Sequence, residues 1–386
     1  MSTDTLYSME ISADQQALRE HIRSFVETNL KPVVGTLDET QEFPTEIFRQ
    51  LGDLGYLGIV FPAEYGGTGL GYLEYAIAVE EVARVCPAVA LGVAAHNGLC
   101  TSHIYRFASE ELKQMYVPNL ASGTWLGAWG LTEPNAGSDA GGTQTRATKD
   151  GGNWIINGSK NFITHGNVGH VCVVMAMTDP SRGKNGISAF VVDKTMPGFY
   201  GSKKENKLGM RCSDTASLTF DNVVVPSSHM IGNEGEGFRQ ALQILDGGRI
   251  SIAALSVGLA QGAFEAATAY AKERMQFGKR LADMQAIQFK LARMSMEIDA
   301  ARMLTYKAAW LRDQKQPFSR EASQAKLYAS ETAVRTAEDA VQIHGGYGYV
   351  KDYPVEKFWR DSKLLTIGEG TSEIQKMVIA RSLLSD

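Results

Sequence analysis

The chain has 386 residues, of which 44% are hydrophobic and 21% charged, and its net charge is −5. A chain of this length and composition can bury a large core and divide into two or three domains. The acidic balance argues against a general nucleic-acid-binding protein, which would usually present a basic face.

Cysteine and histidine spacing gives no sign of a metal centre. Cys86, Cys100, Cys172 and Cys212 form no C-x-x-C pair, and the seven histidines form no H-x-x-x-H pair. We therefore expect reduced thiols and no metal ligands. The acidic N-terminus lacks the features of a signal or transit peptide, and we find no apolar run of 18 residues. The sequence predicts no membrane span and a cytoplasmic protein, or a mitochondrial matrix protein whose transit peptide has been removed.

Residues 1–123 have the pattern of a helical domain. Ser12 and Gln15 form a predicted capping box, followed by Leu18, Ile22 and Phe25 on one helical face. A glycine-rich loop is predicted at 61–71. Further helices are predicted at 45–55, 72–85 and 109–123.

Residues 124–235 have a different pattern. Short β-type runs alternate with Gly, Asn and Asp turns and have no helices between them, which predicts an antiparallel barrel or sandwich. These runs are 154–166, 170–179, 186–193 and 216–226.

Residues 236–386 return to a helical pattern. Apolar residues step by three and four from Ile287 to Leu311, and a second long helix rich in Ala and Ser is predicted at 318–344. We therefore expect an α+β multidomain protein with an N-terminal helical domain, a middle antiparallel β domain and a C-terminal four-helix bundle.

The segment 125–142, with sequence WLGAWGLTEPNAGSDAGG, is the most informative for chemistry. An apolar strand enters a turn whose hydroxyls and backbone N–H groups could hold a flavin edge and phosphate oxygens. The same residues fit an ordinary β-turn with a capping serine equally well. No G-x-G-x-x-G motif is present, so a Rossmann nucleotide site is not indicated.

Glu369 lies between Gly368 and Gly370, after an apolar run and before a helix for which Ser372 and Gln375 predict a second capping box. A carboxylate between two glycines can enter a cavity without steric hindrance, although a solvated loop glutamate fits the pattern too. The segments 273–279 and 342–350 have the pattern of ordinary helix C-caps.

Taken together, these segments resemble the acyl-CoA dehydrogenase family over essentially the whole chain. LTEPNAGSDA is similar to the family's first signature, and QIHGGYGYVKDYPVEKFWRDSKLLTIGEGTSEIQ to the second. The resemblance is closest to the short-chain, butyryl-type branch and its bacterial members. It implies FAD as cofactor, an acyl-CoA thioester as substrate, a homotetramer, and transfer of electrons to an electron-transferring flavoprotein.

The resemblance also implies roles for single residues at the flavin. Phe162 stands where the family usually has Trp, so aromatic packing on the flavin is kept without an indole N–H. Arg274, Phe277, Gln342 and Gly346 match residues that reach the FAD of a neighbouring subunit. The remaining matched cofactor residues are Trp129, Leu131 and Thr132 at the pyrimidine ring, Ser138 near the pyrophosphate and substrate, Thr164 near N5, and Thr371 at the adenine half.

Glu369 matches the base that removes the α-proton of the thioester. Some branches place the base on an earlier helix, at the position of Gly248, which cannot serve. Asp246, Arg249 and Gly370 match substrate-binding positions. The residue before the base is often Tyr and is Gly368 here, which leaves the shape of the acyl pocket and the preferred chain length open.

Two other classes remain as alternatives. The first is a flavin oxidase or monooxygenase of the same fold. A monooxygenase is disfavoured because such relatives commonly lack a glutamate at the position of Glu369. An oxidase is disfavoured because such relatives usually carry a further C-terminal domain, whereas this sequence ends at Asp386. A non-enzymatic helical scaffold would be expected to lose the base or the flavin loop, and neither is lost.

Overall fold

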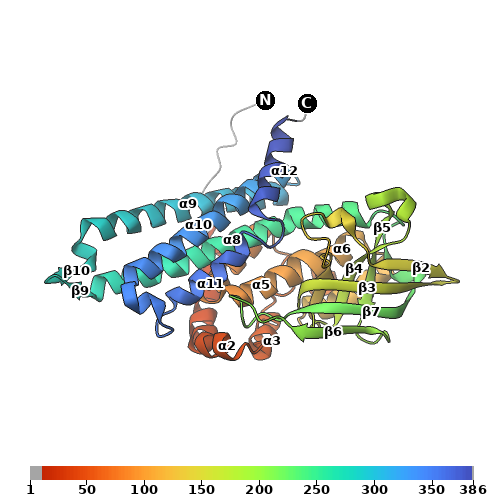
Figure 1. The fold of residues 1–386 in the computed structure, drawn as a ribbon, viewed down its shortest axis with the longest axis horizontal. Helices are drawn as coiled ribbons and strands as arrows, with labels where there is room; N and C mark the ends of the chain where they lie inside the picture. Colours follow the sequence, from red (N-terminus) through yellow and green to blue (C-terminus); the bar gives the residue numbers. More distant parts are fainter. Residues whose placement is uncertain (1–10, 385–386) are drawn as a thin grey trace.

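The computed structural model describes residues 11–384; residues 1–10, most of the acidic N-terminal stretch, lie outside that range. Two helical segments enclose a β segment in the sequence, and the molecule is elongated (Figure 1). The sheet lies at one end and the far ends of the long C-terminal helices lie at the other. The family fold expected from the sequence, with helical, β and helical parts in this order, is confirmed.

The N-terminal segment is helical, as predicted, and the capping box of Ser12 with Gln15 is present. The sequence analysis missed α5, because its residues are apolar on every side and give no amphipathic period; all nine are buried. The helices are α1 (Ala13–Phe25), α2 (Val34–Thr40), α3 (Thr45–Asp53), α4 (Tyr72–Val85), α5 (Pro87–Ala95), α6 (Ser102–Phe107) and α7 (Glu110–Ala121).

A buried π-helical turn, η4 (His96–Thr101), follows α5 and links the sheet to the C-terminal helices. The Cys100 side chain packs against Gly127, where a β-carbon would stand only 2.7 Å from Sγ. The neighbouring Leu99 side chain reaches Gly248, where a β-carbon would stand 3.2 Å from Cδ2 of Leu99. Because π-helical turns are frequent at functional sites, this turn marks the region where the site is assembled.

The β segment forms one eight-stranded sheet in the order β6-β7-β3-β2-β4-β5-β8, with β1 paired to β4. The sheet is mixed, and the expectation of a purely antiparallel arrangement needs correction: β1 runs parallel to β4, and β2 meets β4 in parallel as well. The chain reaches β4 from β1 through β2 and β3, and such a crossover permits parallel pairing. The strands are β1 (Gly127–Gly130), β2 (Arg146–Asp150), β3 (Asn153–Thr164), β4 (Val171–Met177), β5 (Ile187–Asp193), β6 (Phe199–Lys204), β7 (Thr215–Pro226) and β8 (Met230–Ile231).

The C-terminal segment is organised around α8, which packs against α4, α9, α10 and α11. Alanines line the buried faces of α8 and α10 and let the two helices approach closely. The two long helices predicted at 287–311 and 318–344 are present as α9 and α10. The elements are α8 (Gly237–Glu273), the short strands β9 (Met275–Gln276) and β10 (Lys279–Arg280), α9 (Gln285–Asp313), α10 (Ser319–His344), α11 (Val355–Leu365) and α12 (Ser372–Leu384).

Among the described residues, α8 is the one helix long and apolar enough to cross a membrane by length and composition. The sequence analysis found no such run, so this feature was missed. However, 78% of the most apolar window of α8 is buried inside the fold. The core of the protein therefore accounts for the apolar character of this helix.

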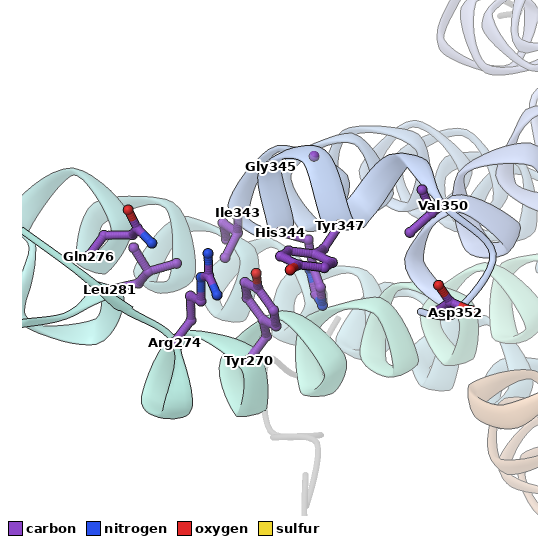
Figure 2. Close-up of a pocket in the computed structure, with 11 residues that line it drawn as sticks. Tyr270, Arg274, Gln276, Leu281, Ile343, His344, Gly345, Tyr347, Val350 and Asp352 are labelled. Atoms are coloured by element: carbon purple, nitrogen blue, oxygen red, sulfur yellow. The ribbon is translucent and has the colours of Figure 1, made fainter.

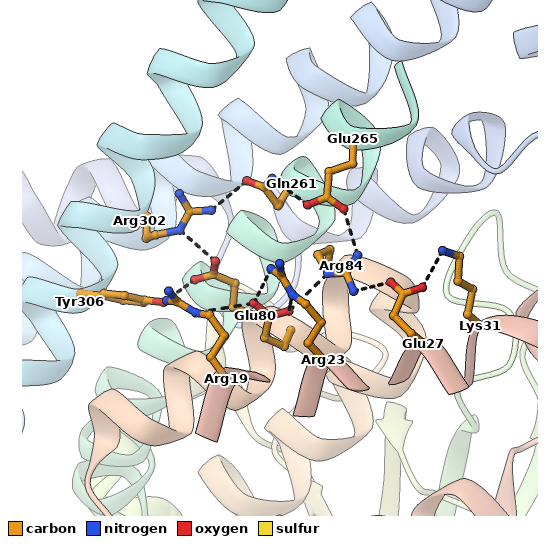
Figure 3. Close-up of polar contacts among 11 residues, drawn as sticks. Arg19, Arg23, Glu27, Lys31, Glu80, Arg84, Gln261, Glu265, Arg302 and Tyr306 are labelled. Carbon is orange, nitrogen blue, oxygen red and sulfur yellow. Dashed lines mark hydrogen bonds and ion pairs between the residues drawn. The ribbon is translucent and has the colours of Figure 1, made fainter. Parts of the chain in front are cut away.

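A network of ion pairs joins the N-terminal helices to the C-terminal bundle (Figure 3). Glu80 of α4 is buried and accepts hydrogen bonds from Arg302 Nε at 2.9 Å and from the Tyr306 hydroxyl at 2.7 Å, both on α9. Arg84 of α4 donates to Glu265 of α8 at 2.9 Å. Buried charges are tolerated only when they are paired, so these contacts fix the position of α4 against α8 and α9.

Candidate active site

Glu369 lies in the short connection between α11 and α12, and its backbone is left-handed, with φ of +52°. A non-glycine residue in this region is uncommon and costs energy, so the surroundings must hold it in place. Gly370 also has positive φ, +95°, and a β-carbon there would stand 2.7 Å from Nε2 of Gln375. Glycine is therefore required at 370.

The predicted capping box of Ser372 with Gln375 is wrong. Thr371 precedes the helix, and its hydroxyl accepts from the Ile374 N–H at 3.4 Å. The Gln375 amide instead donates to the carbonyl of Glu369 at 3.3 Å and to that of Gly370 at 2.9 Å. The left-handed turn at Glu369 brings these carbonyls within reach, so Gln375 stabilises the connection in place of a helix cap.

The Glu369 carboxylate points at α8. A β-carbon at Gly248 would overlap its Oε2, and the Leu99 side chain lies on the same side. Oε2 is buried and has no hydrogen-bond partner within the described residues. Burial raises the pKa of Glu369 to about 7, while the charges of Lys326 and Arg249 act in the opposite direction. A carboxyl group with a pKa near neutrality and an unsatisfied oxygen has the properties of a general base.

Two buried cations flank this carboxylate. Arg249 donates through Nη1 to Asp246 at 2.5 Å and to the Ser323 hydroxyl at 3.3 Å, while its Nε is buried and unpartnered among the described residues. Asp246 also accepts from the Ser319 hydroxyl at 2.8 Å. The structure thus brings Asp246 and Arg249 together beside Glu369.

Lys326 is the second cation, and the sequence analysis did not identify it. Its side chain is buried, and Nζ donates to the Gly370 carbonyl at 2.7 Å. A signal was available in the sequence: Lys326 lies four residues after Ala322 and three before Ala329, on the inner face of an alanine-rich helix. A lysine at a core-facing helical position is rare without a partner.

The flavin residues predicted from the β segment also come together. Trp129 and Leu131 are buried, and the Asn161 N–H donates to the Thr132 carbonyl at 2.8 Å, which places the segment after β1 beside β3. Phe162 lies at a bulge of β3, with φ of +59°, and 65% of its surface is exposed. Bulges redirect side chains, and this one presents an aromatic ring outside the core. Thr164 is two residues further along β3 and partly buried, and Ser138 is exposed on the loop that follows Thr132.

A buried ion pair holds this loop. Lys160 of β3 donates to Glu133 at 2.6 Å and to the Leu131 carbonyl at 3.2 Å. Glu133 also accepts from the backbone N–H groups of Gln144 at 2.7 Å and Thr145 at 3.0 Å. These contacts tie both ends of the loop that carries Ser138 to β3. Neither Lys160 nor Glu133 was predicted as a positioning residue.

Trp129 is fixed from the other side by a hydrogen-bonded chain. Its indole N–H donates to Nδ1 of His103 at 3.0 Å, and His103 Nε2 pairs with the Gln240 side chain of α8 at 3.0 Å. Burial lowers the pKa of His103 to about 4, so the ring is neutral and its Nδ1 can accept the indole proton. This chain connects β1 to the start of α8.

Arg274, Phe277, Gln342 and Gly346 lie at the other end of the C-terminal helices, beyond the end of α8 and around the end of α10. Arg274 directly follows α8, and at about 1.5 Å per residue the helix holds it about 39 Å from Gly248. Arg274 and Gly346 line a pocket of about 600 Å³ between the ends of α8 and α10 (Figure 2). The arginine lies 5.2 Å from the centre of the Tyr347 ring, and the rings of Tyr270 and His344 stack at 4.2 Å.

Two predicted residues adjoin this pocket without lining it. Gln342 is exposed one residue before the lining residue Ile343, and Phe277 is 92% exposed in the turn between β9 and β10. The turn also shows that segment 273–279 is a small hairpin, not a simple helix cap as predicted. Thr371 lines a separate pocket of about 430 Å³ between α10 and α12, together with Arg335 and Lys363.

No group of three His, Cys, Asp or Glu side chains within residues 11–384 could hold a metal ion. The four cysteines are free and buried.

Three comparisons place this architecture among known proteins. Family models described as the N-terminal, middle and C-terminal domains of acyl-CoA dehydrogenase match residues 12–124, 128–223 and 235–384. A short-chain-specific acyl-CoA dehydrogenase of Clostridium acetobutylicum is 48% identical over 96% of this chain and 98% of its own. The solved structure of butyryl-CoA dehydrogenase from Megasphaera elsdenii superposes with a TM-score of 0.97 at 44% identity, covering 98% of this chain and all of the other.

A chain in a structure titled for the electron transferring flavoprotein of Acidaminococcus fermentans superposes equally well, with a TM-score of 0.97 at 45% identity over 98% of this chain and 100% of that chain. The fold and the matched relatives are those of a flavin-dependent oxidoreductase. The chain belongs to the acyl-CoA dehydrogenase family.

Proposed function

We propose that this chain oxidises a short- to medium-chain fatty acyl-CoA thioester to the trans-2-enoyl-CoA, with Glu369 as the base that removes the α-proton. The observation that carries the proposal is the Glu369 carboxylate, which is buried against Gly248 with an unpartnered Oε2 and a pKa of about 7. Because that pKa is near neutrality, a substantial ionised fraction is available to accept a proton at physiological pH.

FAD is the cofactor and, when bound, accepts the hydride from the substrate β-carbon. The residues present fit such a group: an aromatic side chain exposed at a strand bulge, Phe162, stands beside the loop that carries Thr132 and Ser138. We assign the flavin end to Trp129, Leu131, Thr132, Ser138, Phe162 and Thr164, with Thr371 at the adenine half. Asp246, Arg249 and Gly370 are assigned to the acyl-CoA side.

The protein's own part of the reaction is positioning and proton transfer. Burial of the Glu369 carboxyl raises its pKa to about 7 and makes it a stronger base than a solvated glutamate. We assign the backbone N–H of Glu369 as a hydrogen-bond donor to the thioester carbonyl, which must be polarised before the α-proton becomes acidic. Gln375 restrains the backbone at this residue by donating to the Glu369 carbonyl.

We further propose a homotetramer in which Arg274, Phe277, Gln342 and Gly346 contact the FAD of a neighbouring subunit. The separation of about 39 Å along α8 supports this, because it puts Arg274 out of reach of the flavin residues of its own chain. An apolar stripe on α9, composed of Phe289, Met296 and Met303 at seven-residue spacing, offers a surface for subunit contact.

Three further assignments belong to the proposal. Domain boundaries are placed at 123/124 and 235/236. The ends of the neighbouring elements support these positions: α7 ends at Ala121, β1 starts at Gly127, β8 ends at Ile231 and α8 starts at Gly237.

The proposed electron acceptor is an electron-transferring flavoprotein. The structural similarity to a chain in a structure titled for such a flavoprotein supports this assignment. The protein acts in the cytoplasm, or in the mitochondrial matrix if a transit peptide has been removed, without spanning a membrane.

The test is Glu369→Gln, with Glu373→Gln as a matched control at an exposed glutamate on the adjacent helix. Removal of a general base is expected to reduce kcat and kcat/KM together by about 10²- to 10⁴-fold. Substrate should still perturb the flavin spectrum of the variant, but anaerobic bleaching by a panel of acyl-CoAs should be lost. More than about a tenth of the wild-type rate would contradict the role of Glu369. Peroxide formed at the rate of turnover would favour a flavin oxidase instead.

A further inference from the structure

One buried cation near Glu369 has no role in the function proposed above. Lys326 reaches across from α10, and its Nζ bonds the carbonyl of Gly370, the residue that follows the carboxylate. The same carbonyl accepts from the Gln375 amide, so two donors from two different helices hold one peptide group. The ammonium has three donors, and a charged donor makes the stronger of the two bonds.

The position of this peptide group determines the position of the carboxylate. Glu369 has a φ of +52°, which an L-residue rarely adopts without support, whereas the φ of +95° at Gly370 is one that glycine adopts freely. Holding the carbonyl of Gly370 restrains the backbone on the C-terminal side of Glu369. From this backbone the Glu369 side chain extends towards α8, where it lies against Gly248.

The charge of Lys326 has a second consequence. Burial alone disfavours an ionised Glu369, and Lys326 is the larger of the two cationic influences that counteract it, with Arg249 of α8 as the other. Arg249 is already engaged with Asp246, whose negative charge offsets part of its effect. Among residues 11–384, the acidic groups that act on Lys326 are Glu369, Glu331 and Glu373, of which Glu369 has the strongest influence, and the hydrogen bond of Lys326 is to the Gly370 carbonyl.

The remaining charged groups around this pair are limited. Tyr75 of α4 lies near Glu369, but burial raises its pKa well above the ordinary value, so it stays neutral. Glu331 of α10 and Glu373 of α12 act on Lys326 from the solvent side and favour its charged form. Burial lowers the pKa of Lys326 to about 8, which leaves it mainly charged at neutral pH.

We propose that Lys326 is a positioning residue: its ammonium group clamps the Gly370 carbonyl, holds Glu369 against Gly248, and favours the ionised form of the buried carboxylate. The inference rests on the proposed function of Glu369 as the base. It predicts that Lys326 affects the ionisation of Glu369 more than the binding of substrate.

The sign of the effect follows from the charges. A nearby cation favours the ionised carboxylate and lowers its pKa. Loss of the cation should therefore raise the pKa of Glu369 above about 7, and a smaller fraction of the enzyme would carry an active base at neutral pH. The part of the deficit that comes from ionisation should disappear at alkaline pH, where the carboxyl is ionised even without the cation, whereas any part that comes from loss of the clamp on the Gly370 carbonyl should not depend on pH.

The experiment compares Lys326→Met, Lys326→Gln and Lys326→Arg in the holoenzyme, with Lys290→Met as a control that removes a half-exposed lysine paired to Asp339. Met removes donor and charge, Gln keeps a donor without charge, and Arg keeps both. The readouts are the pH profile of kcat/KM and an infrared titration of the Glu369 carboxyl, identified as the band that Glu369→Gln lacks.

We expect the acid limb of the kcat/KM profile and the infrared titration to move up by about one pH unit in Lys326→Met and Lys326→Gln. Near pH 6.5 this corresponds to an up to about tenfold loss of kcat/KM, with recovery above pH 9. Lys326→Arg should restore the titration, and Lys290→Met should not shift it. If Lys326→Met does not fold, Lys326→Gln decides the same question.

An unshifted carboxyl titration in folded Lys326→Gln or Lys326→Met would overturn the proposal. That failure is distinct from failure of the proposed function, which would appear as an active Glu369→Gln enzyme. The infrared titration does not depend on turnover and therefore tests Lys326 in either case.

Discussion

The Glu369 carboxylate lies against the Cα of Gly248, so closely that a β-carbon at residue 248 would overlap Oε2. The two residues are 121 positions apart in the sequence and belong to the α11–α12 connection and to α8. Gly248 therefore matters for its lack of a side chain: it provides the space that the carboxylate occupies.

Gly248→Ala tests this relationship directly. The added methyl group should push the flexible end of Glu369 out of place, because a β-carbon at residue 248 would overlap Oε2 and would also stand only 3.2 Å from Cδ2 of Leu99. We expect kcat/KM to fall by about 10²-fold, since misplacing a reacting group by about 1 Å has effects of this size. FAD content and thermal stability should be retained, because alanine favours a helix more than glycine does. Steady-state kinetics measure kcat/KM, and the flavin spectrum measures the FAD content.

Gly247→Ala is the matched control for that variant. A β-carbon at Gly247 would overlap the Arg312 side chain instead of Glu369. A loss of activity equal to that of Gly248→Ala would show that crowding on α8, and not displacement of Glu369, is responsible.

The base should be transferable between the two positions. In the Glu369→Gln background, Gly248→Glu places a carboxylate in the same cavity from the opposite wall, because the two residues already meet there. We expect part of the lost kcat to return, measurably above the Glu369→Gln background under the same assay. Activity no higher than that of Glu369→Gln alone would show that the cavity admits the carboxylate from one side only.

Glu369→Gln should also change stability in a pH-dependent way. The pKa of Glu369 is raised to about 7 in the folded protein, above the value of about 4.3 for an unfolded chain. The folded state therefore binds the proton more tightly, and the stability gained from that binding is lost as pH rises through 7.

The neutral amide avoids this loss. The variant should exceed the wild type in free energy of unfolding by up to about 4 kcal/mol above pH 7, and the difference should vanish towards pH 4. Denaturant unfolding of the apoenzyme across this range measures it. Glu373→Gln, at an exposed position, should show no such gain, and a constant difference at all pH values would argue against a raised pKa.

Three buried histidines predict acid sensitivity. Burial lowers the pKa of His96 to about 3 and those of His103 and His165 to about 4. An unfolded histidine titrates near 6.5, so unfolding takes up about three protons between these limits. Stability contributed by these groups is present above pH 6.5 and is lost as pH falls towards 4. The His165→Gln variant lacks one of these histidines, so its unfolding should take up about one proton fewer than that of the wild type, and its free energy of unfolding should depend less steeply on pH. An unchanged pH dependence would contradict the buried, neutral state of the His165 ring.

The apolar stripe on α9 predicts an effect on assembly. Phe289 and Met296 are 63% and 66% exposed in the single chain. If this stripe lies in a subunit contact of the proposed tetramer, a charge there is costly, and Phe289→Glu or Met296→Glu should shift the protein towards smaller species in sedimentation velocity at micromolar protein. Met115→Glu, at an exposed methionine of α7, serves as the control. A tetramer unaffected by both α9 variants would place the subunit contact elsewhere.

The sequence by itself determined the order of the helical and β segments and singled out Glu369 as the candidate base. Local periodicity predicted α4, α9 and α10 and the β segment, because amphipathic patterns record which face of an element is buried. Its flanking glycines left Glu369 open between a cavity carboxylate and a solvated loop glutamate, and the resemblance to the acyl-CoA dehydrogenase family singled it out. The same reasoning missed α5, whose residues are apolar on every side, and expected a purely antiparallel sheet, because strand direction depends on long-range pairing.

Only the tertiary structure decided which residues meet at the site. Lys326, Leu99 and Gly248 come from three separate helical segments, and nothing in their local sequence shows that they converge on one carboxylate. The pKa of Glu369 is a property of that convergence, since burial and nearby charge are set by segments distant in the chain. The length of α8 likewise separates Arg274 from Trp129 within one chain, because a helix holds its two ends apart at a fixed rise per residue.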